Sequence, residues 1–497
     1  MFESLLKVKN EVWIAVFVTI LVYIIGYLIR RFRLKFPPGP IGLPVVGYLP
    51  FLSKDVHLKF IELAKKYGDV FSMRLGSVPV VVLNDTASIR EAFTKPECLG
   101  RPPHSSFSVF GVQSPFFMSD MHMWQEQRRF VVHTLKDLGL GRSKIEEQML
   151  DEIAHFCNIL KSHEGKPMDV IVPLTPSISN NICSLIFGKR YGYQEPERIA
   201  LDTNLGEVGK IIGQTAAHIF FPWIKYIPFL MKLLDYEKGS RLFRNSEEIF
   251  TKKINEHKDT LDPKNIRDYM DRYLIEMEIR KKKDPDTTFT DATLMGSVGD
   301  LFGAGSETGR TSISWCLYVV AAYPDVQRKI QEEIMDVLGA ERSPEFLDQK
   351  SMPFTHAVIL EVMRWKSIVP INVLRYTLAN TSISGYDIPQ GTTIMANFWA
   401  VHHDPRNWED PDTFKPERFL SPDGKSVVKS PSYMPFSVGK RACPGETMAY
   451  MQIFLYFVYI LQKFDVRFPE GVKPDFEGNL TITFAPKPFK IRFIPRN

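Results

Sequence analysis

Residues 436–446 read Phe436-Ser437-Val438-Gly439-Lys440-Arg441-Ala442-Cys443-Pro444-Gly445-Glu446, and this stretch decides the fold of the 497-residue chain. An apolar stretch of helical character follows from Thr447 to Phe464, so Cys443 stands at the start of a helix. The dipole and free N–H groups of a helix start favour negative charge and can stabilise a thiolate. Pro444 fits the first helical position, and Gly439 permits a backbone bend or the close approach of a flat, bulky group. The arrangement suits a thiolate ligand to a metal.

Cys443 also has a simpler interpretation, because most single cysteines are small buried hydrophobic residues. The spacing Phe-x-x-Gly-x-Arg-x-Cys-x-Gly favours the metal ligand, since it resembles the haem-binding loop of the cytochrome P-450 family. The resemblance implies that the Cys443 thiolate is the proximal ligand to the iron of haem b. It also implies that Phe436 shields the sulfur side of the haem, that Arg441 contacts a propionate, and that loop N–H groups tune the iron's potential.

Asp291 to Tyr323 is expected to form one long helix with glycines at positions 296, 299, 303, 305 and 309. Each glycine costs roughly 0.5–1 kcal/mol against alanine in a helix interior. Close approach of a large ligand, or a locally opened helix, would explain such a density. Glu307 and Thr308 are polar on this otherwise apolar helix, and without further context they indicate an exposed turn or a satisfied buried pair.

The segment Ala304-Gly305-Ser306-Glu307-Thr308 resembles the oxygen-activation motif of the same family. The resemblance implies that Ala304 lies at the haem, that Thr308 is the distal hydroxyl and that Glu307 is the acid. Together they would deliver protons while dioxygen is activated. Gly309 and Arg310 depart from the family, which commonly continues with small hydroxyl residues, and this departure bears on the shape of the oxygen groove.

Glu361 and Arg364 are three residues apart on a helical stretch and therefore share a face. Exposed pairs of this kind contribute little to stability. In the family, Glu-x-x-Arg forms a buried structural triad with the arginine of a later Pro-Glu-Arg-Phe, here Arg418. The resemblance implies that the triad holds the segment before the haem loop.

Trp124 and Arg128 are four residues apart, so they share a helical face and resemble the pair that contacts the haem propionates. Buried propionates need such donors, because a buried charge must be paired. A stacked pair at the surface is the alternative. Arg375 is another propionate partner by resemblance, although Leu374 departs from the family pattern and a simple surface arginine remains the alternative.

Composition excludes some classes of protein. Lys and Arg total 62 against 57 Asp and Glu, a net charge of +5 that is too mild to indicate nucleic-acid binding. The five cysteines are scattered and odd in number, which favours a reducing compartment over a disulfide framework.

The N-terminus contains an uncharged apolar run from Val12 to Ile29, followed by Arg30, Arg31, Arg33 and Lys35. The run is just long enough to span a bilayer, and the basic residues after it place the rest of the chain in the cytoplasm. A cleaved signal peptide and a buried core helix are the alternatives. We expect a membrane anchor at 1–36, a proline-rich hinge at 37–48 and a catalytic domain at 49–497.

The remaining pattern is mainly helical with a smaller β part, which is the architecture of the family. Residues 143–283 are mostly helical, a hairpin is expected from Val70 to Leu83 with Gly76-Ser77 at its turn, and short strands are expected in 382–393 and 475–494. Arg101 to His122 is expected to be a functional loop. His218 to Leu234 is expected to be buried core, with a membrane-dipping surface near a substrate entrance as the alternative.

The leading hypothesis is a membrane-bound haem-thiolate monooxygenase of the endoplasmic reticulum, acting on a steroid, fatty acid, terpenoid or xenobiotic. The resemblance extends to a microsomal group that includes vertebrate xenobiotic and steroid hydroxylases and arthropod relatives. Electrons would come from NADPH through a reductase that docks on the basic face near Cys443, with Arg128 and Lys440 as candidates. Cytochrome b5 is a further candidate partner. An apolar pocket near Phe302 and Ala304 would take the lipophilic substrate. The rivals are a haem-thiolate isomerase or lyase acting on peroxides, and a haem-binding protein without turnover.

Overall fold

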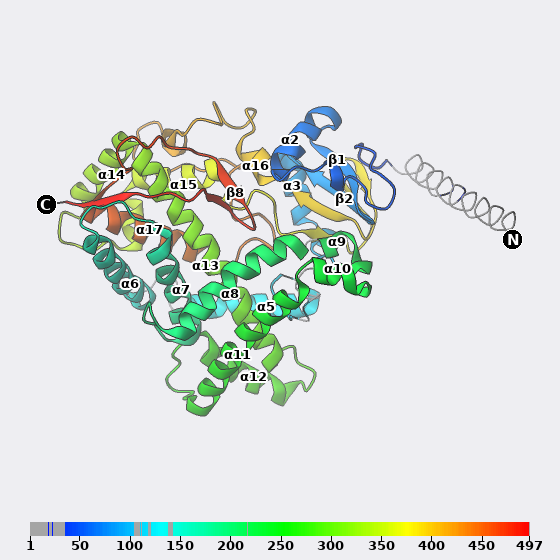
Figure 1. Ribbon diagram of the computed structural model, residues 1–497, viewed down its shortest axis with the longest axis horizontal. Coiled ribbons are helices and arrows are strands. Elements are labelled where there is room, and N and C mark those ends of the chain that lie inside the picture. Colours follow the sequence, from blue (N-terminus) through cyan, green and yellow to red (C-terminus); the bar gives the residue numbers. More distant parts are fainter. Residues whose placement is uncertain are drawn as a thin grey trace.

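The computed structural model describes residues 18, 22, 35–103, 110, 112–117, 121–137, 143–215 and 217–496. The described chain is mainly helical with a smaller sheet part, as the sequence predicts. In Figure 1 the sheet lies at one end and the helices form the larger body. The α-helices of the described residues are α2 Val56–Tyr67, α3 Thr86–Thr94, α5 Met121–Asp137, α6 Ser143–Ser162, α7 Ile171–Phe187, α8 Pro196–Thr215, α9 Ala217–Phe220, α10 Pro228–Leu233, α11 Tyr236–Thr260, α12 Tyr269–Lys283, α13 Asp291–Ala322, α14 Pro324–Val337, α15 Pro353–Lys366, α16 Phe398–His402 and α17 Glu446–Lys463.

Helix α13 is the central element of the helical part. The Thr290 hydroxyl caps its start by accepting from the N–H of Thr293 at 3.1 Å, and Pro324 begins the next helix just beyond its end. Residues 311–321 are buried without a break, so this half of α13 is enclosed by other helices. It packs against α7, α15 and α17 (Figure 1). The expected helix from Asp291 to Tyr323 is thus confirmed to within one residue.

The sheet part contains one four-stranded sheet and three two-stranded ladders. The large sheet has the order β1-β2-β6-β3, in which β2 and β6 are parallel and the other pairs are antiparallel. The predicted hairpin is confirmed, with Gly76 and Ser77 at its turn. The strand bounds are β1 Val70–Leu75, β2 Val78–Leu83, β3 Arg375–Tyr376, β4 Thr381–Ile383, β5 Tyr386–Ile388, β6 Thr393–Ala396, β7 Phe464–Arg467, β8 Gly478–Leu480, β9 Phe484–Pro486 and β10 Arg492–Pro495.

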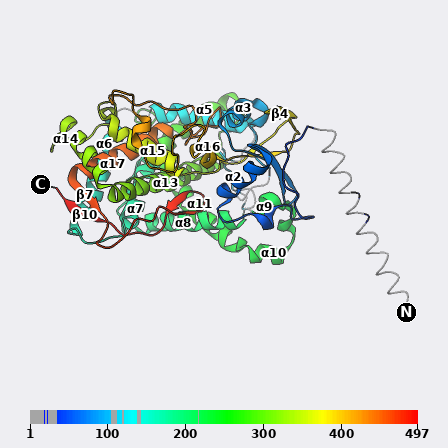
Figure 2. The same ribbon diagram turned by 90° about the horizontal axis from the view of Figure 1, so that it is seen from above.

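Alternating side chains give the large sheet two buried faces. Val80 and Val82 point to one face and pack with Phe60 of α2, whereas Val81 and Leu83 point to the other, against α3. Figure 2 shows the blue sheet between α2 and α3. Two helices on opposite sides of a continuous apolar strand explain why β2 has no polar residue.

Residues 37–48, expected to form a hinge, lie against strand β1. The Ser72 hydroxyl donates to the carbonyl of Pro37 at 2.6 Å, and the Ser72 N–H donates to Pro38 at 2.7 Å. The expected membrane anchor at 1–36 falls outside the described residues, apart from positions 18, 22, 35 and 36. Among the helices that the structure describes, none has the length and apolar character needed to cross a bilayer.

The expectation that 218–234 is buried core is wrong for most of its described side chains, although Ile224 is buried. Tyr226, Phe229 and Leu233 are 75%, 73% and 69% exposed, and Trp223 is 42% exposed. Pro222 and Pro228 each begin a new short element, η3 (Pro222–Tyr226) and α10, so no continuous helix forms here to turn one apolar face inward. We call Trp223, Tyr226, Phe229 and Leu233 the exposed apolar patch.

Three local expectations also need correction. The turn expected at Gly385-Tyr386 lies at Ser384-Gly385, between β4 and β5, because Tyr386 already pairs with Ile383. Met121 and His122, expected at the end of the functional loop, belong to α5, and residues 104–109, 111 and 118–120 of that expected loop lie outside the described residues. Helix α17 starts at Glu446 with Gly445 as its N-cap, so Pro444 lies before the helix rather than at its first position.

Candidate active site

Cys443 lies at the end of a loop that folds back on itself. Its N–H donates to the carbonyl of Phe436 at 2.9 Å, which closes the loop. The Phe436 ring packs edge-on against Tyr450 of α17, with ring centroids 5.0 Å apart. The backbone around Cys443 is therefore held both by its own hydrogen bond and by the helix that follows it.

The Cys443 side chain is exposed, whereas Cys98, Cys157, Cys183 and Cys316 are buried. Protein atoms nevertheless surround the sulfur at longer range, and this desolvation raises the pKa of the Cys443 thiol. The Gly445 N–H and the charge of Arg128 lower that pKa but do not outweigh desolvation. A bound cation beside the sulfur would add positive charge that favours the thiolate.

Gly439 is required by the protein backbone itself. Its φ is +78°, and an added Cβ would lie 2.1 Å from the carbonyl oxygen of Phe93 in α3. The backbone bend expected at this glycine is present. Its close neighbour is a protein carbonyl rather than a flat cofactor, so Gly439 seats the Cys443 loop against α3.

Trp124 and Arg128 share a face of α5, as their spacing predicts, and Arg441 joins them. The guanidinium carbon of Arg441 lies 3.9 Å from the centroid of the buried Trp124 ring, and that of Arg128 lies 5.9 Å from it. Arg441 donates to the carbonyl of Leu99 at 3.1 Å, and Arg128 donates to that of Ala442 at 2.6 Å. Both arginines therefore lie beside the Cys443 loop.

Arg375 in β3 is only 2% exposed, so the interpretation as a surface arginine is wrong. Its Nε and Nη1 atoms have no hydrogen-bond partner. Burial, followed by the charges of Arg101, Arg441 and Arg128, lowers the pKa of the Arg375 guanidinium well below its ordinary value. Four cations therefore lie close enough to repel one another.

Arg101 was not identified from the sequence as a site residue. It donates to the carbonyls of Val373 and Leu374 at 2.5 and 2.6 Å, while its Nε has no partner. The contact joins residues about 270 positions apart, and no local pattern signals it. Burial and the charge of Arg128 lower the pKa of Arg101 to about 9.

The four arginines 101, 128, 375 and 441 form what we call the arginine cluster. Within the described part of the chain, no carboxylate forms an ion pair with any of them. A guanidinium stays protonated in proteins, and buried charge without a counter-ion is costly. The cluster thus fits an anionic group such as the two propionates of haem.

Three of the five glycines of α13, at positions 296, 305 and 309, are required by close packing against protein. A Cβ at Gly305 would lie 2.7 Å from Ile182 of α7, and one at Gly309 would lie 2.6 Å from Gln452 of α17. A Cβ at Gly296 would lie 2.3 Å from the carbonyl oxygen of Gln113. These glycines allow α13 to pack closely against protein, and α13 is helical throughout rather than locally opened.

Ala304 and Thr308 lie one turn apart on the accessible side of α13. Ala304 is exposed although much of the helix is buried, whereas Phe302 is 4% exposed and packs against Phe250. The Thr308 hydroxyl donates to the carbonyl of Ala304 at 2.7 Å. This side of α13, rather than Phe302, can therefore meet a ligand.

Glu307 points to a different set of partners. One oxygen accepts from Arg310 at 2.5 Å, and the other accepts from the Thr483 hydroxyl at 3.1 Å. Thr483 also bonds to the hydroxyl of Thr311 at 3.2 Å. The departure at Arg310 thus gives Glu307 a counter-ion, and no direct bond between Glu307 and Thr308 is present.

Glu361 joins Arg364 and Arg418 in a buried network. Arg364 donates to both carboxylate oxygens at 2.7 and 2.8 Å, and Arg418 donates to one of them at 3.0 Å. Glu361 and Arg364 are both fully buried. The network ties α15 to η5 (Pro416–Phe419), so the three predicted residues meet.

Asp300 was not identified from the sequence, although a carboxylate on an apolar helix was a usable signal. It accepts from the Ser114 hydroxyl at 2.8 Å and from the N–H of Phe116 at 3.0 Å. Arg441 donates to the carbonyl of Phe116 at 3.2 Å. This segment therefore links α13 to the arginine cluster. Burial raises the pKa of Asp300 to about 7.

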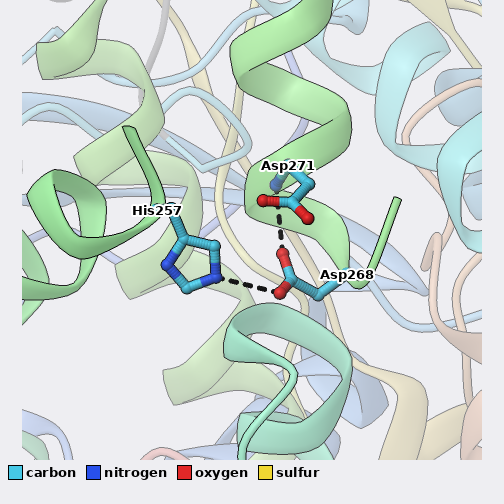
Figure 3. Close-up of side chains that lie close together, drawn as sticks. All are labelled: His257, Asp268 and Asp271. Carbon is cyan, nitrogen blue, oxygen red and sulfur yellow. Dashed lines mark hydrogen bonds and ion pairs between the residues drawn. The ribbon is translucent and has the colours of Figure 1, made fainter. Parts of the chain in front are cut away.

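A second group of titratable residues lies away from Cys443, at His257, Asp268 and Asp271 (Figure 3). Its ligand atoms are already paired. His257 bonds to Asp268 at 2.9 Å and to the carbonyl of Lys253 at 2.7 Å, and Arg267 donates to both oxygens of Asp271 at 2.7 Å. The group joins the end of α11 to the start of α12 and needs no metal.

The exposed Cys443 in its closed loop and the arginine cluster beside that loop would suit an anionic, metal-containing cofactor. The comparisons with known proteins agree. The sequence profile described as Cytochrome P450 matches residues 37–493. Human cytochrome P450 2D6 is 36% identical over 97% of this chain and 98% of its own length.

Two further relatives span mammals and insects. Bovine cytochrome P450 2U1 is 34% identical over 92% of this chain and 88% of its own length. Cytochrome P450 18a1 of Drosophila melanogaster is 34% identical over 95% of this chain and 89% of its own length. The chain therefore belongs to the cytochrome P450 family. It is an oxidoreductase of the monooxygenase class, and its family binds haem iron.

Proposed function

We propose that this chain is a membrane-bound monooxygenase in which Cys443 is the proximal ligand of haem b. Bound haem supplies the redox chemistry that activates dioxygen, so that one oxygen atom enters a lipophilic substrate and the other becomes water. The observation that carries the proposal is the arginine cluster beside the Cys443 loop, whose buried donors lack a carboxylate.

The arginine cluster orients the cofactor. Arg128, Arg375 and Arg441 hold the propionates, and Arg101 adds a fourth positive charge. Arg441 lies over the ring face of Trp124, with its guanidinium carbon 3.9 Å from the ring centroid, and this contact supports the arginine. Charge-assisted hydrogen bonds from several arginines fix both the position and the orientation of a carboxylate.

Thr308 and Glu307 have separate parts in moving protons. The Thr308 hydroxyl, now donating to Ala304 at 2.7 Å, can turn its proton toward a ligand on the accessible side of α13. Glu307 is held by Arg310 and Thr483 and would reach Thr308 through water rather than directly. Glu307 thus serves as the acid of the relay, and Thr308 as its last donor.

The Glu361–Arg364–Arg418 network supports the site without touching the cofactor. Arg364 also donates to the carbonyl of His402 at 2.5 Å, and Glu361 accepts from the N–H of Lys415 at 2.9 Å. These bonds hold the segment that leads to the Cys443 loop.

The membrane of the endoplasmic reticulum is the proposed location, with the anchor at 1–36 and the catalytic domain in the cytoplasm. The exposed apolar patch supports a second contact with the bilayer. At the β1–β2 turn, the Ser77 N–H donates to the carbonyl of Phe220 at 3.0 Å, and the Gly76 N–H donates to the carbonyl of Val46 at 3.0 Å. The β1–β2 turn thus contacts both the segment before the patch and the segment that contains the exposed Ile41 and Val45, and α10 lies near this end of the sheet in Figure 1.

A membrane NADPH reductase is the proposed electron donor, with cytochrome b5 as a further candidate. Lys440 is exposed and precedes Arg441 in the Cys443 loop, so it can contact an acidic partner surface. Arg128 is less suited to docking, because it donates to the carbonyl of Ala442. Lys440→Glu is expected to slow electron transfer, whereas Arg128→Glu is expected to impair haem retention.

The test is turnover with a reconstituted reductase. Purified full-length protein in lipid vesicles, with reductase and NADPH, is supplied with steroids, fatty acids, terpenoids and drug-like compounds, first screened by spectral titration. Hydroxylated or otherwise oxygenated product that contains one atom from labelled dioxygen is the expected result. NADPH consumption without product from any compound that binds would contradict the proposal.

A further inference from the structure

His402, at the end of α16, connects the buried triad to the Cys443 loop. Its side chain is fully buried. The Nδ1 atom lies 2.7 Å from the Ser367 hydroxyl oxygen, at the end of α15. The Nε2 atom lies 3.1 Å from the backbone nitrogen of Met434, where the approach to the loop begins. On the main chain, Arg364 donates to the His402 carbonyl at 2.5 Å.

The hydrogen-bond partners assign a single tautomer to His402. The Ser367 hydroxyl has one proton, which it donates to the carbonyl of Arg364 at 2.9 Å. Its oxygen must therefore accept from Nδ1, which carries the proton. The backbone N–H of Met434 can only donate, so Nε2 must accept. His402 is thus neutral and held between a fixed acceptor and a fixed donor.

Met434 connects His402 to the Cys443 loop. Its carbonyl accepts from the N–H of Ser437 at 3.0 Å, and its side chain is 2% exposed in a cluster with Phe93. The backbone carbonyl of Phe93 also packs closely against Gly439. Moving Met434 therefore moves both the turn before Cys443 and the surface on which the loop rests.

We propose that His402 is a positioning residue of the haem-thiolate site. It transmits the fixed position of α15 and the triad to the Cys443 loop, and so sets the orientation of the thiolate. The proposal rests on Cys443 being the iron ligand. Removing the acceptor leaves the buried Met434 N–H unpaired, which favours states in which the loop has moved.

The experiment compares three variants of the full-length haem-loaded protein. His402→Phe keeps a ring of similar size but removes both side-chain hydrogen bonds. His402→Gln keeps an oxygen that can accept from Met434. His403→Phe is the matched control, because His403 stacks on Trp399 at 4.2 Å and bonds only to the Trp399 carbonyl in its own helix. The readouts are haem retention, the reduction potential and the absorption band of the reduced carbon monoxide complex.

For His402→Phe we expect a shifted reduction potential. We also expect that the carbon monoxide complexes without the red-shifted thiolate band increase about tenfold relative to the complexes with it. His402→Gln is expected to recover most of that band, and His403→Phe to match the wild type. A His402→Phe protein with the wild-type potential and band would overturn the proposal, even if its melting temperature fell. A wild-type protein without the red-shifted band would instead refute Cys443 as the ligand.

If His402→Phe does not fold, the proposal is tested by the hydrogen-exchange rate of the Met434 amide in Ser367→Ala. Ser367→Ala removes the partner of Nδ1 and frees the His402 ring to turn. The amide of Met434 is then expected to exchange about ten times faster than in the wild type, because a buried N–H has lost a secure acceptor. Equal exchange rates in the two proteins would overturn the proposal.

Discussion

Replacing Glu361 by glutamine is expected to destabilise the protein by about 3–5 kcal/mol, the range for removing one partner of a buried ion pair. The two carboxylate oxygens accept four hydrogen bonds, from Arg364 twice, Arg418 once and the N–H of Lys415 once. Glutamine has a single acceptor oxygen, and its NH2 group would face donors. Arg364, which is fully buried, would lose its counter-ion. The expected loss is a large part of a typical total stability of about 5–15 kcal/mol.

The assay is denaturant unfolding of the wild type, Glu361→Gln and a control, followed by tryptophan fluorescence. Glu332→Gln is the control, because Glu332 pairs with Arg328 at 3.1 Å while both side chains are about 60% exposed. Exposed pairs of this kind contribute less than about 1 kcal/mol. A loss in Glu361→Gln no larger than in Glu332→Gln would refute the argument that the buried triad supports the Cys443 loop.

Three further predictions concern single residues. Burial raises the pKa of Asp300 to about 7, so the folded state binds the extra proton and the stability of the protein falls as pH rises from about 4 to 7. Asp300→Asn is expected to flatten that part of the curve of stability against pH. An unchanged slope would contradict this prediction. Gly439→Ala would place a Cβ 2.1 Å from the Phe93 carbonyl, so haem retention should fall at least tenfold. Thr308→Ala is expected to raise the ratio of released peroxide to product, and unchanged coupling measured against NADPH use would count against Thr308 as proton donor.

The sequence was sufficient where a motif is local or where two motifs meet in a fixed way. The hairpin in 70–83 and the long helix from Asp291 follow from alternation and from an apolar run, and both are present. Glu361 and Arg364 share a helix face, so their contact follows from spacing. The membership of the cytochrome P450 family was likewise accessible, because the Cys443 loop carries a specific spacing.

The sequence was insufficient where the partner is distant along the chain. Arg101 joins the cluster through carbonyls about 270 residues away, and Gly439 is required by Phe93. The expected burial of 218–234 failed because composition records that a segment is apolar but not what covers it. The desolvation that raises the pKa of the Cys443 thiol was likewise not visible in the sequence, because it depends on all the surrounding elements.

The most direct test of the central claim is the absorption spectrum of the reduced, carbon monoxide-bound protein, recorded for the wild type and for Cys443→Ser. Serine has nearly the same shape but does not provide a thiolate, and the other four cysteines are buried and cannot replace it. We expect the red-shifted thiolate band in the wild type and its complete loss in Cys443→Ser. Retention of that band in Cys443→Ser would contradict the assignment of Cys443 as the iron ligand.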